Sequence, residues 1–378
     1  MKRSDKRIYL FANFGEWGKQ QYGGGEVSNR RTLQQLRLAG YDVKVIEKYK
    51  MVRNHSLLNL VLLFFKMASD VIRFTCVMAV QRRKDSLVHI VGFYAHTVFF
   101  EDCLVSISKA LGYKTIYNMC GGGASEYYET WNVMYKKTFR HIVNTADVIF
   151  TEGKENSTLI KELCGEKRLF YYPNYVTRDF LPTECPSKPE DRINFVYFGR
   201  ISPTKNIDII IETFNLIRQR FDNAYLDIFG NSTDSEYSEH IKEKIHTCQA
   251  GRYIKIHQAC DHNELKPLIS DKHIFLFPTS EPHEGHSNAL TEAMAWGIIP
   301  IASERGFNRT VIGNENLILK EVAPEAFAAK IIELLESGQI GNYAREMHER
   351  VKNNYTEEIV STMLINEYDS LFEIFSMK

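Results

Sequence analysis

The chain has 378 residues, of which 44% are hydrophobic and 25% are charged, a composition typical of a globular protein. Its length exceeds that of most single domains, so we expect two domains. The 47 basic and 47 acidic side chains cancel to a formal net charge of zero. This balance argues against a nucleic-acid binder, because such proteins usually carry a basic excess.

The cysteines and the N-terminus suggest a cytoplasmic protein. Seven scattered cysteines without a Cys-x-x-Cys pair predict reduced thiols rather than a disulfide framework or a zinc site. The first residues, "MKRSDKRIYLFANFG", are basic and then only briefly apolar. That apolar run is too short for a signal peptide and predicts a first strand instead.

The first half of the chain alternates short apolar runs with helical patterns. A first helix is predicted over 30–40, where Gly40 provides a C-terminal cap. The predicted strands are 7–13, 42–47, 86–92, 114–119 and 147–152. Such alternation predicts a parallel sheet covered by helices on both faces.

Residues 57–80 form a strongly apolar predicted helix, interrupted by Lys66, Asp70 and Arg73. No charge-free run approaches the ~20 residues that a membrane span needs. Two interpretations stay open: a core helix, which is the more common case, or a helix that also touches an anionic membrane surface. The flanking sequence contains basic residues that suit the second: Lys48, Lys50, Arg53, Arg82, Arg83 and Lys84.

The second half repeats the alternation after a segment rich in Pro and polar residues, 171–192, which we interpret as a linker. Its predicted strands are 193–199, 224–230, 253–257, 273–279 and 298–303. One predicted helix, 206–221, places six apolar residues on one face: Ile207, Ile210, Ile211, Phe214, Ile217 and Phe221. Two doubly wound α/β units in tandem follow, with a last helix over about 356–376.

Two basic residues follow the first strand of the second half, in "FVYFGRISPTKNIDIII". Arg200 leaves the carboxyl end of that strand, and Lys205 lies where the next helix begins. Ligands of open α/β sheets bind at this edge, and two cations near a helix N-terminus suit an anion such as a diphosphate. A solvated loop with two basic residues is the alternative.

Two acids surround a predicted helix start in "EPHEGHSNALTEAMAWG", residues 281–297. Ser287 and Asn288 are good N-caps, and the first amides of the helix would face an anion. Glu284 and Glu292 are acceptors suited to sugar hydroxyls, so the stretch predicts a site for a polyol phosphate. A capped helix with favourable acids near its start is the alternative.

Glycine loops and histidines in the first half are weaker signals. Gly23, Gly24 and Gly25 precede the first helix and form an anion loop or a close-approach loop, although no Walker A sequence is present. A second glycine loop follows the fourth strand in "NMCGGGASEYYE". His89 lies inside the predicted strand 86–92, so we expect it to be a core or edge residue of the sheet. His96 and Glu101 could reach a ligand cleft, but nothing in the sequence establishes their geometry.

The order of these pieces resembles the nucleotide-sugar-dependent glycosyltransferases of the GT-B fold, the retaining "group 1" type. The resemblance covers nearly the whole chain, and includes "YPNYV", "FGRISPTKN" and the Glu-x7-Glu signature in "PTSEPHEGHSNALTEAMAWGIIPIAS". It implies two Rossmann-like domains facing across a cleft. Residues 1–175 would bind the acceptor, residues 188–355 the nucleotide sugar, and the helix of 356–378 would cross back to the N-terminal domain.

The resemblance also assigns roles to residues of the second half. Arg200 and Lys205 match the basic pair that grips the donor diphosphate. Glu292 matches the acid that holds the ribose hydroxyls, and Glu284 the acid beside the donor sugar, to which a catalytic part is sometimes given. Donor-binding amides would come from the helix start: Gly285, His286, Ser287, Asn288 and Ala289.

One departure from the family concerns the other half, where Gly24 and Gly25 would approach the phosphates. Cys120 stands where this family often has a histidine, so that histidine's role cannot be carried over. His89 or His96 are substitutes only by guess. The departure puts the acceptor-side chemistry in doubt.

We therefore expect sugar transfer from a nucleoside diphosphate to a hydroxyl of a glycan or lipid-linked acceptor. The resemblance implies retention of configuration and no metal ion or cofactor, since an Asp-x-Asp motif is missing. It also suggests bacterial cell-surface polysaccharide or lipopolysaccharide synthesis at the inner face of the membrane. The alternatives are a nucleotide-sugar epimerase or a phosphorylase of the same fold, or a non-catalytic partner subunit.

Overall fold

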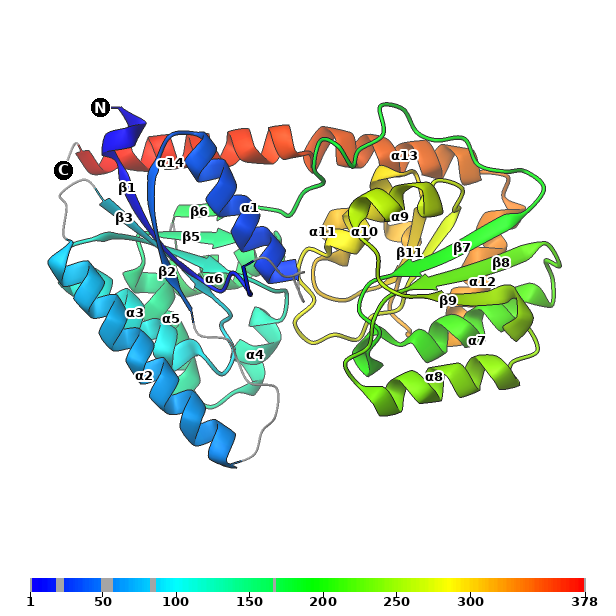
Figure 1. Ribbon diagram of the computed structural model, residues 1–378, viewed down its shortest axis with the longest axis horizontal. Helices are drawn as coiled ribbons and strands as arrows, with labels where there is room; N and C mark the ends of the chain where they lie inside the picture. Colours follow the sequence, from blue (N-terminus) through cyan, green and yellow to red (C-terminus); the bar gives the residue numbers. More distant parts are fainter. Residues whose placement is uncertain (1, 18–23, 49–56, 82–85, 166–167, 377–378) are drawn as a thin grey trace. The chain divides into compact units, whose positions relative to one another are not determined.

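The computed structural model describes residues 2–17, 24–48, 57–81, 86–165 and 168–376 (Figure 1). The chain divides into two compact units: unit 1 is Met1–Pro173 with Ser361–Lys378, and unit 2 is Asn174–Val360. Several residues considered above lie outside the described ranges: Gly23, Lys50, Arg53, Arg82, Arg83 and Lys84.

The segment interpreted as a linker is mostly an integral part of unit 2. Val176 forms a parallel bridge with Thr356, and the carbonyl of Pro189 is bonded to His273 Nε2 at 2.9 Å. At the other end of the segment, Tyr171 belongs to the last strand of unit 1. Proline and polar residues mark irregular backbone, but irregular backbone can pack on a domain as closely as a strand does.

Unit 1 is built on a parallel sheet in the order β2-β1-β3-β4-β5-β6. Its strands are β1 Arg7–Ala12, β2 Asp42–Glu47, β3 Ser86–Gly92, β4 Lys114–Met119, β5 Val148–Thr151 and β6 Arg168–Tyr171. The first five coincide with predicted strands. The sequence analysis missed β6, because four half-buried residues at a sheet edge do not show a clear period.

The helices of unit 1 connect these strands. They are α1 Gly24–Leu38, α2 Leu57–Val80, α3 Val98–Ala110, α4 Ala124–Thr130, α5 Val133–Thr145 and α6 Asn156–Cys164, after a short 3-10 turn, Arg3–Asp5. α1 begins six residues earlier than predicted, so Gly24 and Gly25 lie in its first turn rather than in a loop. Glu26 in that turn favours the early start, because an acid interacts well with a helix N-terminus.

The last helix, α14 (Glu357–Ser376), completes unit 1 from Ser361 onward. Tyr368 is fully buried, and its hydroxyl is bonded to Nδ1 of His89. Nearby, Arg168 donates to both carboxylate oxygens of Glu367 at 2.8 and 2.9 Å. These contacts pack the C-terminal helix on the sheet of unit 1.

Unit 2 has a parallel sheet in the order β12-β11-β10-β7-β8-β9. The strands are β7 Ile193–Phe198, β8 Ala224–Phe229, β9 Ile254–His257, β10 Ile274–Phe277, β11 Ile299–Ser303 and β12 Ile318–Leu319. Counted along the unit, this is the order 3-2-1-4-5-6 mirrored, the doubly wound arrangement of dinucleotide-binding folds. The two-residue β12 was not predicted.

The helices of unit 2 cover both faces of its sheet. They are α7 Ile207–Arg218, α8 Ser235–Thr247, α9 His262–Ile269, α10 Asn288–Ala295, α11 Asn308–Ile312, α12 Pro324–Glu336 and α13 Ile340–Asn354, with 3-10 turns at Pro203–Lys205, Gly251–Tyr253 and Glu315–Leu317. α7 buries the predicted apolar face but ends at Arg218, so Phe221 lies beyond it. The reason is a tight turn after Arg218, where the amides of Gln219 and Arg220 bond carbonyls three residues back.

Two global features bear on the sequence expectations. All seven cysteines lie in the described ranges and are unpaired. Among the described helices, none combines the length and apolar character required to cross a membrane.

Asp369 of α14 is the charge that fastens this helix to the start of the chain. Its carboxylate accepts hydrogen bonds from Arg3, Lys6 and Tyr41. Burial alone would raise the pKa of Asp369, but these hydrogen bonds outweigh it and lower the pKa to about 2. The stabilisation is therefore complete above the unfolded pKa of about 4 and is lost as the pH falls through about 2.

We predict that Asp369→Asn lowers the free energy of unfolding at neutral pH by about 1–2 kcal/mol. The difference from the wild type should shrink as the pH falls from about 4 to about 2, because the wild-type carboxyl then takes up its proton. Urea unfolding followed by circular dichroism measures both, with Glu129→Gln at an exposed site as the control. A loss independent of pH would contradict the role of the charge.

Candidate functional site

The candidate site of unit 2 lies where its strand order reverses, between β7 and β10. Ligands of doubly wound sheets bind at such a switch point, outside the carboxyl ends of the strands. The loops that follow the two strands are bonded to each other. The amide of Ser280 donates to the carbonyl of Thr204 at 2.8 Å, and Asn206 Nδ2 donates to the carbonyl of Pro278 at 2.7 Å.

A buried ion pair joins these loops at their centre. Lys205 comes from the 3-10 turn after β7, and its Nζ is bonded to Oε2 of Glu284 from the loop after β10. Their side chains are only 10% and 8% exposed. Thr279 Oγ1 donates a second hydrogen bond to the same carboxylate oxygen at 2.7 Å. The structure thus brings two sequence-predicted site residues into direct contact, although the prediction gave each a different part of the donor to bind.

The end of β11 and the loop after it contact the backbone of the loop that carries Glu284. Gly306 has a φ of +55°, and a Cβ there would overlap the carbonyl oxygen of Glu284. Ser303 Oγ donates to the carbonyl of Thr279 at 2.6 Å, and Arg305 Nε to that of Glu281 at 3.1 Å. Gly306 was not among the predicted site residues. A glycine directly after an apolar strand, in "ERGFNRTVI", was the sequence signal for a close approach of backbone at this place.

Arg200 lies at the same edge of the sheet and is exposed. It follows Gly199, whose φ of +145° turns the chain directly after β7. Tyr197, fully buried in the strand, donates its hydroxyl to the Arg200 carbonyl at 2.7 Å. The backbone of Arg200 is therefore fastened, while its guanidinium faces solvent.

The start of α10 has one of the two predicted N-caps, Ser287. Ser287 is the N-cap, and its Oγ accepts from the amide of Leu290 at 3.4 Å. Asn288 and Ala289 follow as the first helical residues, whose amides have no carbonyl of a preceding helical turn to bond. Gly285 lies two residues before the cap.

The side chain of His286 is buried, although the prediction concerned only its backbone amide. Its ring is buried, Nε2 is bonded to Thr291 Oγ1 at 2.8 Å, and the ring packs edge-on against Tyr355 at 4.8 Å. Its carbonyl accepts from Asn174 Nδ2 at 2.7 Å. The imidazole thus fills the interior of unit 2, and the sequence could not show this inward turn because it depends on a partner about 70 residues away.

Glu292 on α10 has a partner that the sequence analysis missed. Its Oε1 lies 3.1 Å from Nε2 of His262, the first residue of α9. Asp261 caps α9 through a capping box, which sets the position of His262. The ring of His262 also packs on buried Phe180 at 4.9 Å. Nearly buried Glu292 is thereby held in one orientation, and "CDHNEL" was the only sequence signal for this helix start.

In unit 1, Cys120 and Glu152 form a second candidate group at the ends of β4 and β5. Cys120 is buried, and burial, reinforced by the carboxylate of Glu152, raises its pKa well above the usual range. The thiol is therefore neutral at physiological pH. Glu152 also accepts from the amide of Gly121 at 3.4 Å. The sequence analysis did not consider Glu152, which stands directly after a strand, at the ligand edge.

The two histidines in and after β3, His89 and His96, differ in their exposure to solvent. His89 is fully buried in the sheet, and burial lowers its pKa to about 3, so it is a core residue as the sequence suggested. His96 is exposed and packs edge-on against Trp131 at 4.9 Å.

Glu101 is fully buried, which rules out the possibility that its side chain reaches a ligand cleft. It accepts from the amide of Phe93 at 2.9 Å, from the hydroxyls of Thr97 and Tyr117 at 2.7 Å each, and from Lys48 Nζ at 3.1 Å. Burial favours its protonated form, but Lys48 and these donors outweigh burial and lower its pKa. Glu101 thus stabilises the loop after β3, because a buried carboxylate needs such partners.

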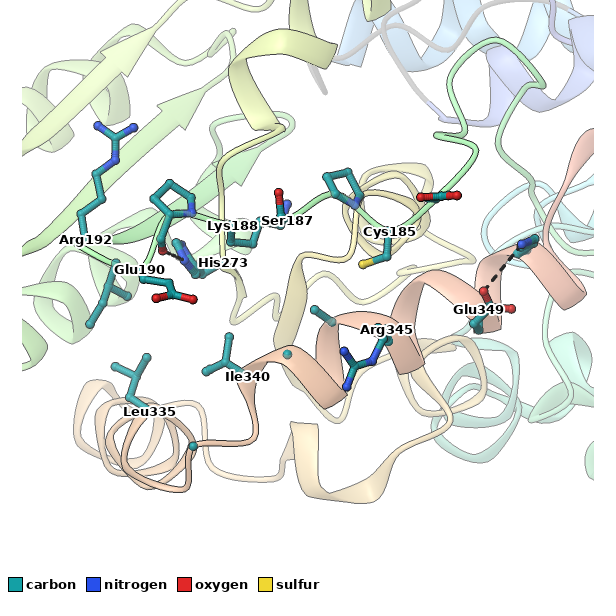
Figure 2. Close-up of a pocket in the computed structure, with 18 of the residues that line it drawn as sticks. Cys185, Ser187, Lys188, Glu190, Arg192, His273, Leu335, Ile340, Arg345 and Glu349 are labelled. Atoms are coloured by element: carbon teal, nitrogen blue, oxygen red, sulfur yellow. Dashed lines mark hydrogen bonds and ion pairs between the residues drawn. The ribbon is translucent and has the colours of Figure 1, made fainter.

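A cavity of about 930 Å³ opens elsewhere in unit 2 (Figure 2). Its lining includes Ile193, Phe221 and His273, which stand at or before the amino ends of their strands, together with Lys188 and Arg345. None of the predicted donor residues lines it. The cavity belongs to the edge of the sheet opposite the switch point, so we do not place the active site there. Within the described ranges, no group of three or more His, Cys, Asp or Glu side chains could hold a metal ion.

Comparisons with known proteins bear on both units. Residues 184–357, slightly less than half of the chain, match the model of a family described as glycosyl transferases group 1. No curated protein matches the chain by sequence.

Solved structures resemble the chain over nearly its full length. Sucrose-phosphate synthase (tll1590) from Thermosynechococcus elongatus is 16% identical with a TM-score of 0.76, covering 98% of this chain and 100% of that one. A glycosyltransferase from Rickettsia africae ESF-5 is 15% identical with a TM-score of 0.71, covering 98% and 99%. Anabaena Alr3699/HepE in complex with UDP is 12% identical with a TM-score of 0.70, covering 97% and 100%. At such identities the likeness shows the fold, and it confirms the predicted fold class.

The buried Lys205–Glu284 pair generates a prediction about stability. Lys205→Met or Glu284→Gln alone should lower the free energy of unfolding by about 3 kcal/mol, because each leaves the other charge buried without its partner. The double variant should lose less than the sum of the two. Urea unfolding of the four proteins measures the coupling, and the exposed pair Lys242–Glu239 provides the control cycle. Additive losses would show that the two groups do not depend on each other.

Proposed function

We propose that this protein, which has the GT-B fold and matches the group 1 glycosyltransferase family over residues 184–357, is a glycosyltransferase of that family. It would move a sugar from a nucleoside-diphosphate sugar to a hydroxyl acceptor. One observation carries the proposal: Lys205 and Glu284, two charged residues within the matched range, are paired at the switch point of unit 2. Solved complexes of the similarly folded HepE contain UDP and UDP-glucose, which supports a donor of this chemical class.

The donor's polar groups match three parts of the unit 2 site. Glu292, oriented by His262, would accept hydrogen bonds from the ribose hydroxyls. Lys205 and Arg200 would bind the diphosphate, together with the first amides of α10. In this proposal the diphosphate replaces Glu284 as a partner of the Lys205 ammonium, which leaves Glu284 beside the sugar.

The barrier of the reaction lies in breaking the bond between the anomeric carbon and the phosphate oxygen. Negative charge then grows on the leaving diphosphate, and fixed cations and amides near that position lower the barrier most. Lys205 and Arg200 supply this positive charge from the protein itself, so we propose transfer without a divalent metal ion. Retention of the anomeric configuration is proposed from the family resemblance, and nuclear magnetic resonance of the product would establish it.

The acceptor is proposed to bind unit 1 at the ends of β3, β4 and β5. Cys120 stands in the place of the family histidine, and the adjacent Glu152 is the ionisable group that could receive an acceptor hydroxyl. Trp131 and Tyr127 of the neighbouring α4 region stack at 5.3 Å, beside exposed His96. Aromatic faces of this kind suit sugar rings, which supports a glycan or lipid-linked glycan acceptor. We place this reaction in bacterial cell-surface polysaccharide or lipopolysaccharide synthesis at the cytoplasmic face of the membrane.

A thermal-shift screen of nucleotide sugars tests the donor assignment. A donor present at about 100 times its Kd stabilises the native state by about 2.7 kcal/mol, which corresponds to a rise in Tm of roughly 5–10 °C. We expect Glu292→Gln to abolish the shift. His262→Ala should reduce it, because the carboxylate then loses its orienting partner.

The matched control is Glu239→Gln, at an exposed site on α8, which should shift as the wild type does. If no nucleotide sugar shifts the wild type, or if Glu292→Gln responds fully, the donor site is assigned wrongly.

Turnover tests the role of Lys205. Lys205→Ala should lower kcat about a hundredfold or more, since removal of one charge-stabilising donor costs about 2.7–4 kcal/mol in the barrier. Lys242→Ala, at an exposed position, is the control and should keep full turnover. Folding of each variant is checked by circular dichroism. Near-wild-type transfer by Lys205→Ala would refute the role, and conversion of the donor without an acceptor would indicate an epimerase instead.

A further inference from the structure

The outward face of α2 exposes an unusual amount of apolar surface. Phe64, Phe65 and Ile72 are 68%, 64% and 64% exposed. Sixteen large hydrophobic side chains are exposed in the described ranges, and six of them belong to this one helix: Val61, Leu62, Phe64, Phe65, Ile72 and Val80. Scattered exposed apolar residues need no explanation, but a concentration on one element marks an interaction surface.

Part of this exposed surface forms a stripe along one side of the helix. At 100° per residue, Val61, Phe65, Ile72 and Cys76 fall within an arc of about 60°. We call this stripe, with Phe64 at its border, the outer face of α2. All of them lie on the side of α2 that the core leaves open, and Figure 1 shows α2 beside α3 in unit 1.

The opposite face of α2 already provides its attachment to the fold. Phe74 and Met78 are fully buried in the core of unit 1, and Met67, Val71 and Val77 pack against that core. The helix is therefore held in place without any contribution from the outer face. Apolar residues on that face are not explained by the stability of unit 1.

The charges on α2 indicate which kind of partner would cover the outer face. Lys66 and Arg73 are exposed at one border of the stripe. Asp70 is the only acid of the helix, and it is buried and paired with Arg73 at 2.7 Å. Exposed charge on this helix is thus entirely positive. A second copy of the chain would bring like charges together, whereas anionic lipid headgroups would complement them.

We propose that the outer face of α2 docks unit 1 on an anionic lipid surface. The helix lies in the plane of the interface, with Phe64, Phe65 and Ile72 among the acyl chains and Lys66 and Arg73 at the headgroups. No described helix could span the bilayer, so the contact is peripheral. The surface contact is independent of the transferase activity; its link to a lipid-linked acceptor rests on the proposed function.

Vesicle flotation of the full chain tests the proposal. The wild type should float with phosphatidylcholine vesicles that contain phosphatidylglycerol, and less with phosphatidylcholine alone. Phe64→Ser combined with Phe65→Ser should lower the bound-to-free ratio at least tenfold, because both rings leave the interface. Lys66→Glu should lower it about fivefold or more on the anionic vesicles only.

The matched control is Leu38→Ser, an equally exposed apolar site on α1, which should bind as the wild type does. Unfolding curves should coincide for all variants, because every substituted side chain is exposed. The proposal is overturned if the wild type does not float with anionic vesicles. It is also overturned if the double Ser variant floats as well as the wild type. A wild-type dimer that the double variant converts to monomer in size-exclusion chromatography overturns it as well.

Thiol labelling gives a second measurement on the unmodified protein. Cys76 lies on the outer face, and Cys260 lies in unit 2. Anionic vesicles should slow maleimide labelling of Cys76 and leave that of Cys260 unchanged, as read by mass spectrometry. Equal effects on both thiols would contradict docking through α2. Donor-induced thermal shifts are measured without vesicles, so failure of the lipid contact and failure of the proposed function are distinguishable.

Discussion

The buried pair of Lys205 and Glu284 is the interaction on which the site of unit 2 depends. Two opposite charges that are nearly removed from water are costly unless each satisfies the other. Here the partners come from loops after different strands, so the pair also determines how those loops lie. Two further residues hold Glu284 in place. Thr279 donates a hydrogen bond to its carboxylate, and Gly306, which has no side chain, leaves room for its backbone. A diphosphate that binds the ammonium would take up an interaction that the protein already holds in position.

The strand order explains why the two units differ in chemistry. In unit 2 the order reverses between β7 and β10, and the loops there carry the basic and acidic residues of the proposed donor site. In unit 1 the order places β1 between β2 and β3, and the loop after β3 is stabilised by buried Glu101. This loop exposes the rings of Phe93 and His96. In the proposed function, the charged site of unit 2 would bind the donor and the aromatic surface of unit 1 the acceptor.

Unit 1 also shows how one helix can serve two surfaces. The inner face of α2 contributes Phe74 and Met78 to the core, and its outer face remains apolar. The two sequence interpretations of residues 57–80, a core helix or a helix that touches a membrane, are therefore compatible. Because a helix presents different residues every 100°, the same segment can be anchored on one side and available on the other.

Most of the strands, and the strand ends where polar residues gather, could be predicted from the sequence. The spacing of apolar residues predicted ten of the twelve strands. The preference of serine for the N-cap position indicated the start of α10 at Ser287. The same patterns select Arg200, Lys205, Glu284 and Glu292 as candidate site residues. These features depend on neighbours within a few residues, and a sequence displays such neighbours directly.

Which of these residues contact one another depends on the tertiary structure. Lys205 and Glu284 are 79 residues apart, yet they touch because β7 and β10 are adjacent in the sheet. Glu292 meets His262 through the placement of α9, and the ring of His286 turns inward against Tyr355. Such contacts follow from strand order and helix packing, which arise from the whole unit rather than from any local pattern.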